Sequence, residues 1–410
     1  MVLAWIRRHT GALLALDAAI VYWWVGPGQV GTDAFIPLAQ ALLEGRAYLI
    51  GDRPWLELVP RTPGTWYVPF PPGPAIILAP FLLVLGDRIL DTSMAAGIAG
   101  GAAVWLMWKL VGRIGLSRRE QLWLTIAFAF GTEHMYVATH AGNHLVAQAF
   151  AAMFLLAALI LAIDRHWMLA GVALSFATLC RLPVAFAAPV VAWLAWRGLD
   201  LEPVSALGAF AGRAVGKIPW QSLLAYGSVL AMTALLVLGY NATRWGDPLD
   251  FGYARIVDVA GNRVIDEPWY SHGIESIAYL PRGLYAMLLK GFDFVDEFPW
   301  LRPSLIGTAI TFTMPAVFWA LRAPWRAPVV VVAWVSATLI LIPDLLHGAT
   351  GFSQFGYRFV EDALPILWLL VGIAVLHRGL TRPLRAALLI GIAVNLYATV
   401  ALYGLSFTAP

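Results

Sequence analysis

Long apolar runs separated by short polar segments recur along the whole chain and predict a bundle of helices that crosses a membrane. The predicted spans lie near residues 10–26, 92–112, 121–138, 145–163, 168–181, 183–196, 221–240, 304–321, 328–345, 363–377 and 386–404. A further apolar run, 74–86 (PAIILAPFLLVLG), has only 13 residues and contains Pro80. Because a full span needs about 20 residues, we expect this run to lie at the membrane surface.

The basic residues test this expectation, because loops rich in Lys and Arg stay on the cytoplasmic side. If 74–86 does not cross, 15 of the 27 basic residues fall on one side, together with only four of the 24 acidic residues. These basic residues are Arg7, Arg8, Lys109, Arg113, Arg118, Arg119, Arg165, Arg197, Arg213, Lys217, Arg322, Arg326, Arg378, Arg382 and Arg385. The bias predicts eleven spans, with the N-terminus inside and the C-terminus outside.

Composition agrees with a membrane protein. Hydrophobic residues make up 60% of the 410 residues and charged residues 12%, whereas soluble domains have about 25% charged residues. The net charge of +3 comes mostly from loop arginines and does not indicate a nucleic-acid partner. A single cysteine, Cys180, excludes an internal disulfide. The N-terminal segment has no small-residue cleavage site, so we expect the first span to be retained. The predicted fold class is an all-α polytopic membrane protein of about 11 transmembrane helices, a single domain over residues 1–410.

Polar residues that could carry chemistry concentrate in three predicted outer loops. These loops cover residues 27–91, 241–303 and 346–362, and they are long and rich in aromatic residues. Such loops above a helical bundle are typical of an enzyme that works at the membrane surface. The predicted compartment of the site is therefore extracytoplasmic, in a multi-pass protein of the cell inner or plasma membrane.

The first outer loop predicts two juxtamembrane helices, 33–45 and 71–86. Thr32 or Asp33 can cap the first of them, and Gly45 can end it. Its apolar side chains, Phe35, Leu38, Leu42 and Leu43, are expected to face lipid, with Gln40 and Glu44 facing away. At the positive end of this helix Asp33 is expected to stay ionised. Asp33 is then either a plain helix cap or a base that activates an acceptor hydroxyl.

Three stretches of the first 200 residues resemble the GT-C class of membrane glycosyltransferases. They are GTDAFIPLAQALLEGR, WYVPFPPGPAIILAPFLLVLG and LAGVALSFATLCRLPVAFAAPVVAW, and the pattern is most similar to the protein O-mannosyltransferase and lipid A aminoarabinose transferase group. The resemblance implies inverting transfer of a sugar from a polyprenyl-phosphate carrier to a hydroxyl acceptor on the outer face, with Asp33 as base. Ala34 stands where the mannosyltransferases have a second acid. The resemblance covers residues 1–200 and leaves 221–404 as a variable half. We expect no cofactor and no metal ion.

A lipid-phosphate leaving group needs cations that hold its charge. Arg181 matches the basic residue that ends the corresponding helix in the family, and the resemblance gives it a phosphate-binding role; snorkelling to headgroups is the alternative. Arg358 and Tyr357 lie in QFGYRFVED, a stretch similar to late-loop segments of relatives. Arg358 is a second phosphate-binding candidate, and a salt bridge to Glu361 or Asp362 is its alternative.

Other polar and aromatic residues are weaker candidates for donor or substrate contact. Glu133, His134, His140 and His144 gather at one predicted helix–loop–helix junction, where His140 and His144 would share a helix face. Metal binding, interfacial hydrogen bonding and donor contact by His144 are all open there. Trp66 and Tyr67 could stack on a sugar ring or a prenyl chain, or belong to an aromatic belt.

The main alternative function is a transporter or lipid flippase of the cell envelope. Its strongest feature is Asp17, an acid inside the first predicted span that could pair within the bundle. Transporters usually have a repeat between their halves and polar residues in several spans, and neither is evident here. A scaffold without catalysis is a third alternative. Asn241 begins a glycosylation motif in the second predicted outer loop.

Overall fold

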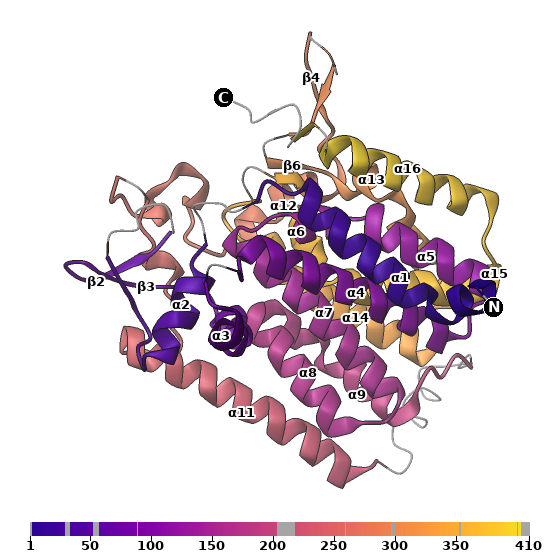
Figure 1. Ribbon diagram of the computed structural model, residues 1–410, viewed down its shortest axis with the longest axis horizontal. Coiled ribbons are helices and arrows are strands. Elements are labelled where there is room, and N and C mark those ends of the chain that lie inside the picture. The colour runs from indigo at the N-terminus through magenta and orange to yellow at the C-terminus, as the bar shows by residue number, and fades with distance from the viewer. Residues whose placement is uncertain are drawn as a thin grey trace.

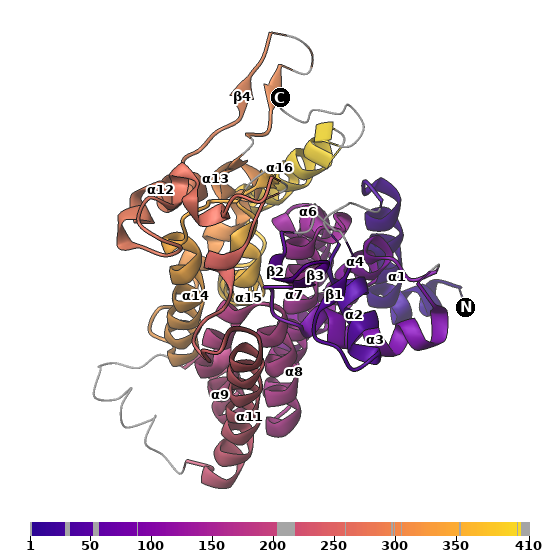
Figure 2. The same ribbon diagram turned by 90° about the vertical axis from the view of Figure 1, so that its left-hand side faces the viewer.

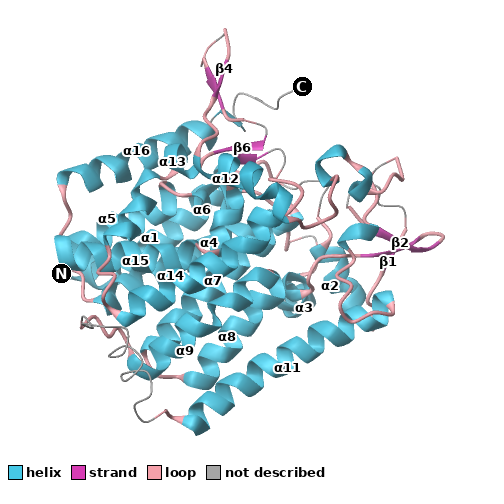
Figure 3. Ribbon diagram, turned by 180° about the vertical axis from the view of Figure 1, so that it is seen from behind, coloured by secondary structure: helices cyan, strands magenta, loops and turns pink. Residues whose placement is uncertain are grey.

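The computed structural model describes residues 2–28, 33–51, 57–87, 89–202, 218–258, 260–296, 298, 300–304, 306–351, 354–399 and 401–402. Thr32, Arg213 and Lys217, which enter the predictions above, lie outside the described residues. The described chain is mostly helical, with short strands at its edges (Figure 3).

The five longest helices are α1 (Val2–Val25), α4 (Thr92–Ile114), α7 (Asn143–Ile163), α11 (Trp220–Trp245) and α14 (Pro328–Leu346). Within the described residues, α4, α7, α11 and α14 are long and apolar enough to cross a membrane. The structure therefore supports a membrane-embedded bundle, whereas the predicted total of eleven spans stays a prediction.

Shorter helices complete the bundle. They are α2 (Phe35–Leu43), α3 (Gly73–Leu85), α5 (Arg118–Phe130), α6 (Glu133–Thr139), α8 (Trp167–Cys180), α9 (Ala188–Arg197), α12 (Leu280–Leu288), α13 (Ile310–Thr313), α15 (Leu364–Arg378) and α16 (Arg382–Thr399). The 3₁₀ helices are η2 (Leu182–Ala187), η3 (Tyr253–Arg255), η4 (Val264–Asp266), η5 (Pro268–Tyr270), η6 (Ile277–Tyr279), η7 (Pro315–Arg322) and η8 (Arg358–Asp362).

The core of the bundle is formed by α4, α7 and α8, with α1 packed along α4 (Figures 1 and 2). Small residues make the α1–α4 contact close: a Cβ added to Gly101 would lie 2.6 Å from the Ala15 carbonyl oxygen. Such small residues let membrane helices approach each other, because association there depends on close packing.

Three small sheets accompany the helices. An antiparallel sheet of order β1-β3-β2 joins β1 (Leu49–Ile50), β2 (Val59–Thr62) and β3 (Thr65–Tyr67). A second pairs β4 (Asp293–Phe294) with β5 (Leu301–Arg302), and a parallel pair joins β6 (Ile306–Thr308) to β7 (Gln354–Gly356). The β1–β3 sheet, α2 and α3 lie together at the end of the bundle opposite the N-terminus (Figure 1).

The first loop contains the two predicted short helices, α2 and α3, each with bounds within two residues of the prediction. The prediction for the apolar face of α2 is wrong. Phe35 and Leu38 are fully buried in the protein, where Phe35 packs 6.4 Å from the Phe70 ring, and they do not face lipid. Only Leu43 is substantially exposed, because the β1–β3 sheet and α3 cover α2.

Two predicted spans are not continuous helices. The range 121–138 is divided between α5 and α6, because the helix ends at Gly131 and the Thr132 side chain caps α6 by accepting from the His134 N–H. The range 304–321 contains β6, α13 and η7. Pro315 has no N–H to continue a helix, and Ile306–Thr308 pairs with the distant strand β7.

Candidate functional site

Arg181 links three segments that are far apart in the chain. It follows α8, and its Nε donates to Asp362 Oδ2 at 2.8 Å. Its Nη2 also lies 3.3 Å from Asp344 Oδ1 in the last turn of α14. Asp362 is fully buried and ends η8, just before α15. Arg181 is therefore an ion-paired side chain in the bundle, and a role as an exposed snorkelling arginine does not fit this geometry.

Arg358, at the start of η8, is a buried cation with neutral partners. Its Nε donates to Gln354 Oε1 at 2.9 Å, and its Nη1 lies 3.4 Å from Gln148 Oε1. Within the described residues, no carboxylate forms an ion pair with it. The alternative salt bridge to Glu361 or Asp362 is wrong, because those acids bond to His134 and Arg181 instead. Burial lowers the pKa of Arg358, and the nearby charge of Arg181 lowers it further.

His144 begins α7 beside this pair of arginines. Its Nε2 lies 3.1 Å from Glu57 Oε2, and its ring packs 4.6 Å from the Phe70 ring. Burial raises the pKa of Glu57, but the hydrogen bond and charge of His144 and the charge of Arg358 outweigh it, so the net pKa lies below its ordinary value. Glu57 has a φ of +49°, a conformation that is costly for a non-glycine residue and is often found at functional sites.

We call Arg181, Arg358, Asp344, Asp362, His144 and Glu57 the arginine cluster. Tyr253 and His347 adjoin it. Burial raises the pKa of Tyr253 while the charge of Arg181 opposes the shift, and burial lowers the pKa of His347 to about 4 with help from Arg181. His347 is therefore neutral at pH 7, and its Nε2 lies 3.3 Å from the Tyr270 hydroxyl.

Asp33 caps α2, which is one of the two roles that the sequence predicts for it. Its Oδ1 accepts from the N–H groups of Phe35 and Ile36 at 3.0 and 3.3 Å, and its Oδ2 accepts from the Thr92 hydroxyl at 2.9 Å. The next N–H, of Ala34, donates to Asn143 Oδ1 at 2.6 Å. Asp33 is thereby tied to the first turn of α7, which also carries His144. Ala34 is fully buried, so the second acid of the resembled family would be buried at this position.

The PFPPG stretch has a packing explanation. Gly73 begins α3 against the backbone at Leu179 and Cys180, and a Cβ at this position would collide with it. Glycine therefore lets the first loop approach the end of α8 directly before Arg181.

Glu133 is a buried acid that packs against strand β7. It is fully buried in α6 and interacts with the Thr313 side chain. A Cβ at Gly356 in β7 would collide with its carboxylate. The neighbouring His134 is held between Glu361 Oε1 at 2.7 Å and the Gly100 carbonyl at 3.1 Å.

The remaining predicted residues are placed as follows. The α6–α7 junction is confirmed, but His140 precedes α7 and does not share a helix face with His144; its Nδ1 accepts from the Gly142 N–H at 2.9 Å. Glu133, His140 and His144 are directed to different partners, and within the described residues no three acidic, histidine or cysteine side chains group around one point. Tyr357 is fully buried, with its hydroxyl 3.4 Å from the Asp344 carbonyl.

The aromatic pair of β3 lies apart from the arginine cluster. Trp66 Nε1 donates to the Gly51 carbonyl at 2.8 Å. The Tyr67 hydroxyl accepts from Arg61 at 3.2 Å, and its ring packs 5.2 Å from Trp245. These contacts stabilise the β1–β3 sheet against α11, and no contact between the described residues joins either ring to Arg181 or Arg358.

Several polar residues of the site were not among the predicted ones. Asp344 stands inside a predicted span, and the same rule that singled out Asp17 should have found it. Glu57, Gln148 and Gln354 carry no signal that distinguishes them from other polar residues near a membrane surface.

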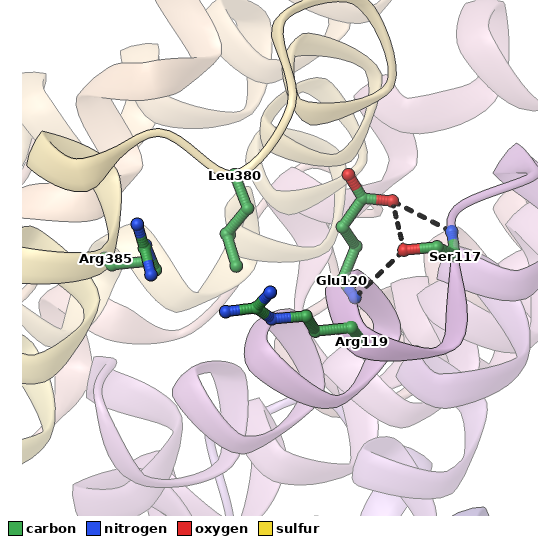
Figure 4. A pocket seen from close by; sticks show the side chains of 5 residues that line it. All are labelled: Ser117, Arg119, Glu120, Leu380 and Arg385. Atoms are coloured by element: carbon green, nitrogen blue, oxygen red, sulfur yellow. Dashed lines mark hydrogen bonds between the residues drawn. The ribbon is translucent and has the colours of Figure 1, made fainter.

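One pocket of about 330 Å³ lies far from this cluster, at the end of the bundle that carries the N-terminus. It is lined by Ser117, Arg119, Glu120, Leu380 and Arg385 (Figure 4). Glu120 is occupied there by the capping box of α5, in which its carboxylate accepts from the Ser117 N–H and hydroxyl. Its arginines belong to the set that the charge bias assigns to the inner face.

Comparisons with protein-family models, with curated proteins and with solved structures found no match for this chain.

Proposed function

We propose that this protein is a membrane glycosyltransferase of the GT-C type. It transfers a sugar, with inversion, from a polyprenyl-phosphate carrier to a hydroxyl acceptor at the outer face of the membrane. The eleven predicted spans and the inside N-terminus belong to this proposal, as does the assignment of the arginine cluster to the outer face.

The observation that carries the proposal is that the buried guanidinium of Arg358 has no direct carboxylate partner among the described residues. A buried guanidinium is normally paired with a carboxylate, because a charge without a partner is costly to remove from water. The partners of Arg358 are two neutral side-chain oxygens, and Arg181 is close enough to repel it. An anion bound beside Arg358 would relieve both costs, and a phosphate accepts the hydrogen bonds that a guanidinium donates.

In the proposed reaction, the positive charge of Arg358 acts during cleavage of the donor. As the glycosidic bond breaks, negative charge grows on the phosphate oxygen of the leaving lipid. Arg358 stabilises that charge in the proposed mechanism. Arg181, which is paired with Asp362 and Asp344, holds η8 and α14 in position around it. His144 borders the phosphate on the side of the first loop.

The acceptor side of the proposed reaction uses Asp33. Its carboxylate removes the proton from the acceptor hydroxyl as the hydroxyl attacks the sugar carbon. The hydrogen bond from Ala34 to Asn143 supports this assignment, because it fixes the start of α2 against the turn that carries His144. Glu57 is the other carboxylate on this side of the cluster.

Binding of undecaprenyl phosphate to the protein in lipid nanodiscs tests the proposal. Arg358→Gln should weaken binding by about tenfold or more, since a hydrogen-bonded charge contributes about 1.5–3 kcal/mol. Arg113→Gln is the matched control, because Arg113 pairs with Asp164 at the other end of the bundle and should leave binding unchanged. Equal binding by wild type and Arg358→Gln would exclude the phosphate site.

The transporter alternative loses its strongest feature. Asp17 is its candidate for a buried coupling acid, but the Asp17 side chain is exposed on the outside of the bundle. No other observation favours transport.

A further inference from the structure

The pocket between the start of α5 and the start of α16 is lined by two arginines. Arg119 belongs to the first turn of α5 and Arg385 to the first turn of α16, and their guanidinium groups border the same cavity beside Leu380 (Figure 4). The volume of this α5–α16 pocket, about 330 Å³, lies in the usual range of small-ligand sites, about 300–1,000 Å³. The pocket is therefore large enough for a ligand that the two arginines could hold.

Neither of these arginines has an anionic partner. Among the described residues no hydrogen bond or ion pair reaches either guanidinium, and Arg385 Nε is shielded from solvent without an acceptor. Arg113, at the same end of the bundle, is instead paired with Asp164. The acid of the pocket, Glu120, is engaged by the capping box. A shielded N–H without an acceptor is costly, and an anion in the cavity would supply the acceptor.

The two helix ends add to the positive charge of the pocket. The first turn of a helix carries partial positive charge, so it favours anions and disfavours cations. Nevertheless α5 begins with Arg118 and Arg119, and the first turn of α16 contains Arg382 and Arg385 and no acid. A bound anion would interact favourably with the arginines and with both helix ends at once.

The neighbouring surface of α16 indicates which kind of anion fits. Leu389 is 54% exposed and lies one turn beyond Arg385 on the same face of the helix, and the adjacent Ile390 is 52% exposed. Guanidinium groups bind phosphate oxygens through paired hydrogen bonds. A phospholipid offers both parts, since its phosphate can contact the arginines while its acyl chains lie along the apolar residues. Basic pockets between membrane helices bind anionic headgroups in this way.

We propose that the α5–α16 pocket binds the phosphate of an anionic phospholipid, with Arg119 and Arg385 as its ligands. Leu380 forms the apolar wall beside the headgroup. The bound lipid joins the start of α5 to the start of α16. This site lies far from the arginine cluster, at the end of the bundle that carries the N-terminus. The inference goes beyond the proposed function and does not depend on it.

Lipid binding to the purified protein in a neutral detergent, counted by native mass spectrometry, tests the charges. The probe is dioleoylphosphatidylglycerol. The double variant Arg119→Gln, Arg385→Gln should bind it about tenfold more weakly or less, because hydrogen bonds from two charged groups are lost. The matched control is Arg322→Gln, Arg326→Gln, which removes the same charge from exposed residues before α14 and should bind like the wild type. Equal binding by the pocket variant and the wild type, or an equal loss in the control, would overturn the proposal.

Two single substitutions test whether the lipid enters the cavity. Leu380→Trp fills part of the cavity and leaves both arginines in place, so it should weaken binding. Glu120→Gln removes the acid of the pocket but can keep the capping box, so it should strengthen binding. Thermal midpoints without lipid show whether each variant is folded. A folded Leu380→Trp variant that binds like the wild type would place the lipid outside the pocket and overturn the proposal.

Competition identifies the source of the phosphate. Inorganic phosphate offers the same oxygens without acyl chains, so phosphatidylglycerol should bind at least about tenfold more tightly. Equal affinities would assign the pocket to free phosphate and overturn the lipid assignment. Arg358→Gln should leave phosphatidylglycerol binding unchanged, because Arg358 lies in the arginine cluster. This variant therefore separates a failure of the lipid site from a failure of the proposed donor site.

Discussion

At the scale of single residues, Asp33 combines a structural contact with its proposed chemistry. Asp33→Asn keeps an oxygen that can accept from the α2 N–H groups, so its effect on stability should be below about 1 kcal/mol. Loss of the base should lower sugar transfer by about 10²- to 10⁴-fold. Transfer assays with the purified variant, beside its thermal midpoint, measure both effects.

The control for this prediction is Glu57→Gln. Glu57 contacts His144 on the same side of the arginine cluster but is not assigned a proton transfer. Glu57→Gln should keep a larger fraction of the wild-type sugar-transfer activity than Asp33→Asn does. The reverse ranking, with Asp33→Asn active and Glu57→Gln inactive, would move the base from Asp33 to Glu57.

At the scale of elements, the contact of α6 with β7 depends on one glycine. A Cβ at Gly356 would collide with the Glu133 carboxylate, which is fully buried and has no room to move into solvent. Gly356→Ala should therefore destabilise the protein by about 1–3 kcal/mol, the usual cost of overpacking. The thermal midpoint in a fixed detergent or nanodisc measures the change.

A double variant separates this collision from other effects of the added methyl group. Glu133→Ala removes the carboxylate and leaves space that the methyl group introduced by Gly356→Ala can fill. The double variant should be more stable than Gly356→Ala alone, so the two substitutions should not be additive. If Gly356→Ala lowers the thermal midpoint equally in the wild type and in the Glu133→Ala background, the predicted contact is disproved.

At the scale of the whole molecule, hydropathy correctly predicts the bounds of those helices whose ends are set by neighbouring residues in the sequence. The ranges of α7, α14 and α15 differ from the predicted spans by at most two residues at each end, because each is an apolar run with polar residues or turns beyond it. Residues 304–321 are also mostly apolar, but Pro315 and the pairing of β6 with a strand 48 residues away divide them. Hydropathy does not detect a distant pairing partner.

The sequence predicts the basic residues of the candidate site but not the acids that pair with them. The resemblance predicts that Arg181, Arg358 and His144 contact a donor phosphate, and the structure brings these three side chains together. Which acid bonds to which base depends on η8. Glu361 and Asp362 are adjacent in a 3₁₀ helix of three residues per turn, so their side chains point in different directions. Glu361 reaches His134 and Asp362 reaches Arg181, and no feature of the sequence predicts that turn.

The stability of the whole protein should fall on acidification because two loop histidines are held neutral. Burial lowers the pKa of His140 and His347 to about 4, and the charges of Arg358 and Arg181 contribute. Between about pH 6.5 and pH 4 the unfolded chain binds a proton at each histidine that the native state does not bind. Stability therefore falls as pH falls, by up to about 1.4 kcal/mol per pH unit for each histidine.

Substitution of both histidines isolates this effect from the carboxylates that titrate in the same range. Burial raises the pKa of Glu275 and Glu361, so these groups oppose the histidines as pH falls. They remain in the double variant His140→Gln, His347→Gln, whose unfolding midpoint should fall less between pH 6.5 and pH 4 than that of the wild type. Identical slopes for the double variant and the wild type would show that the two rings take up protons in the folded protein, contrary to their burial beside the arginine cluster.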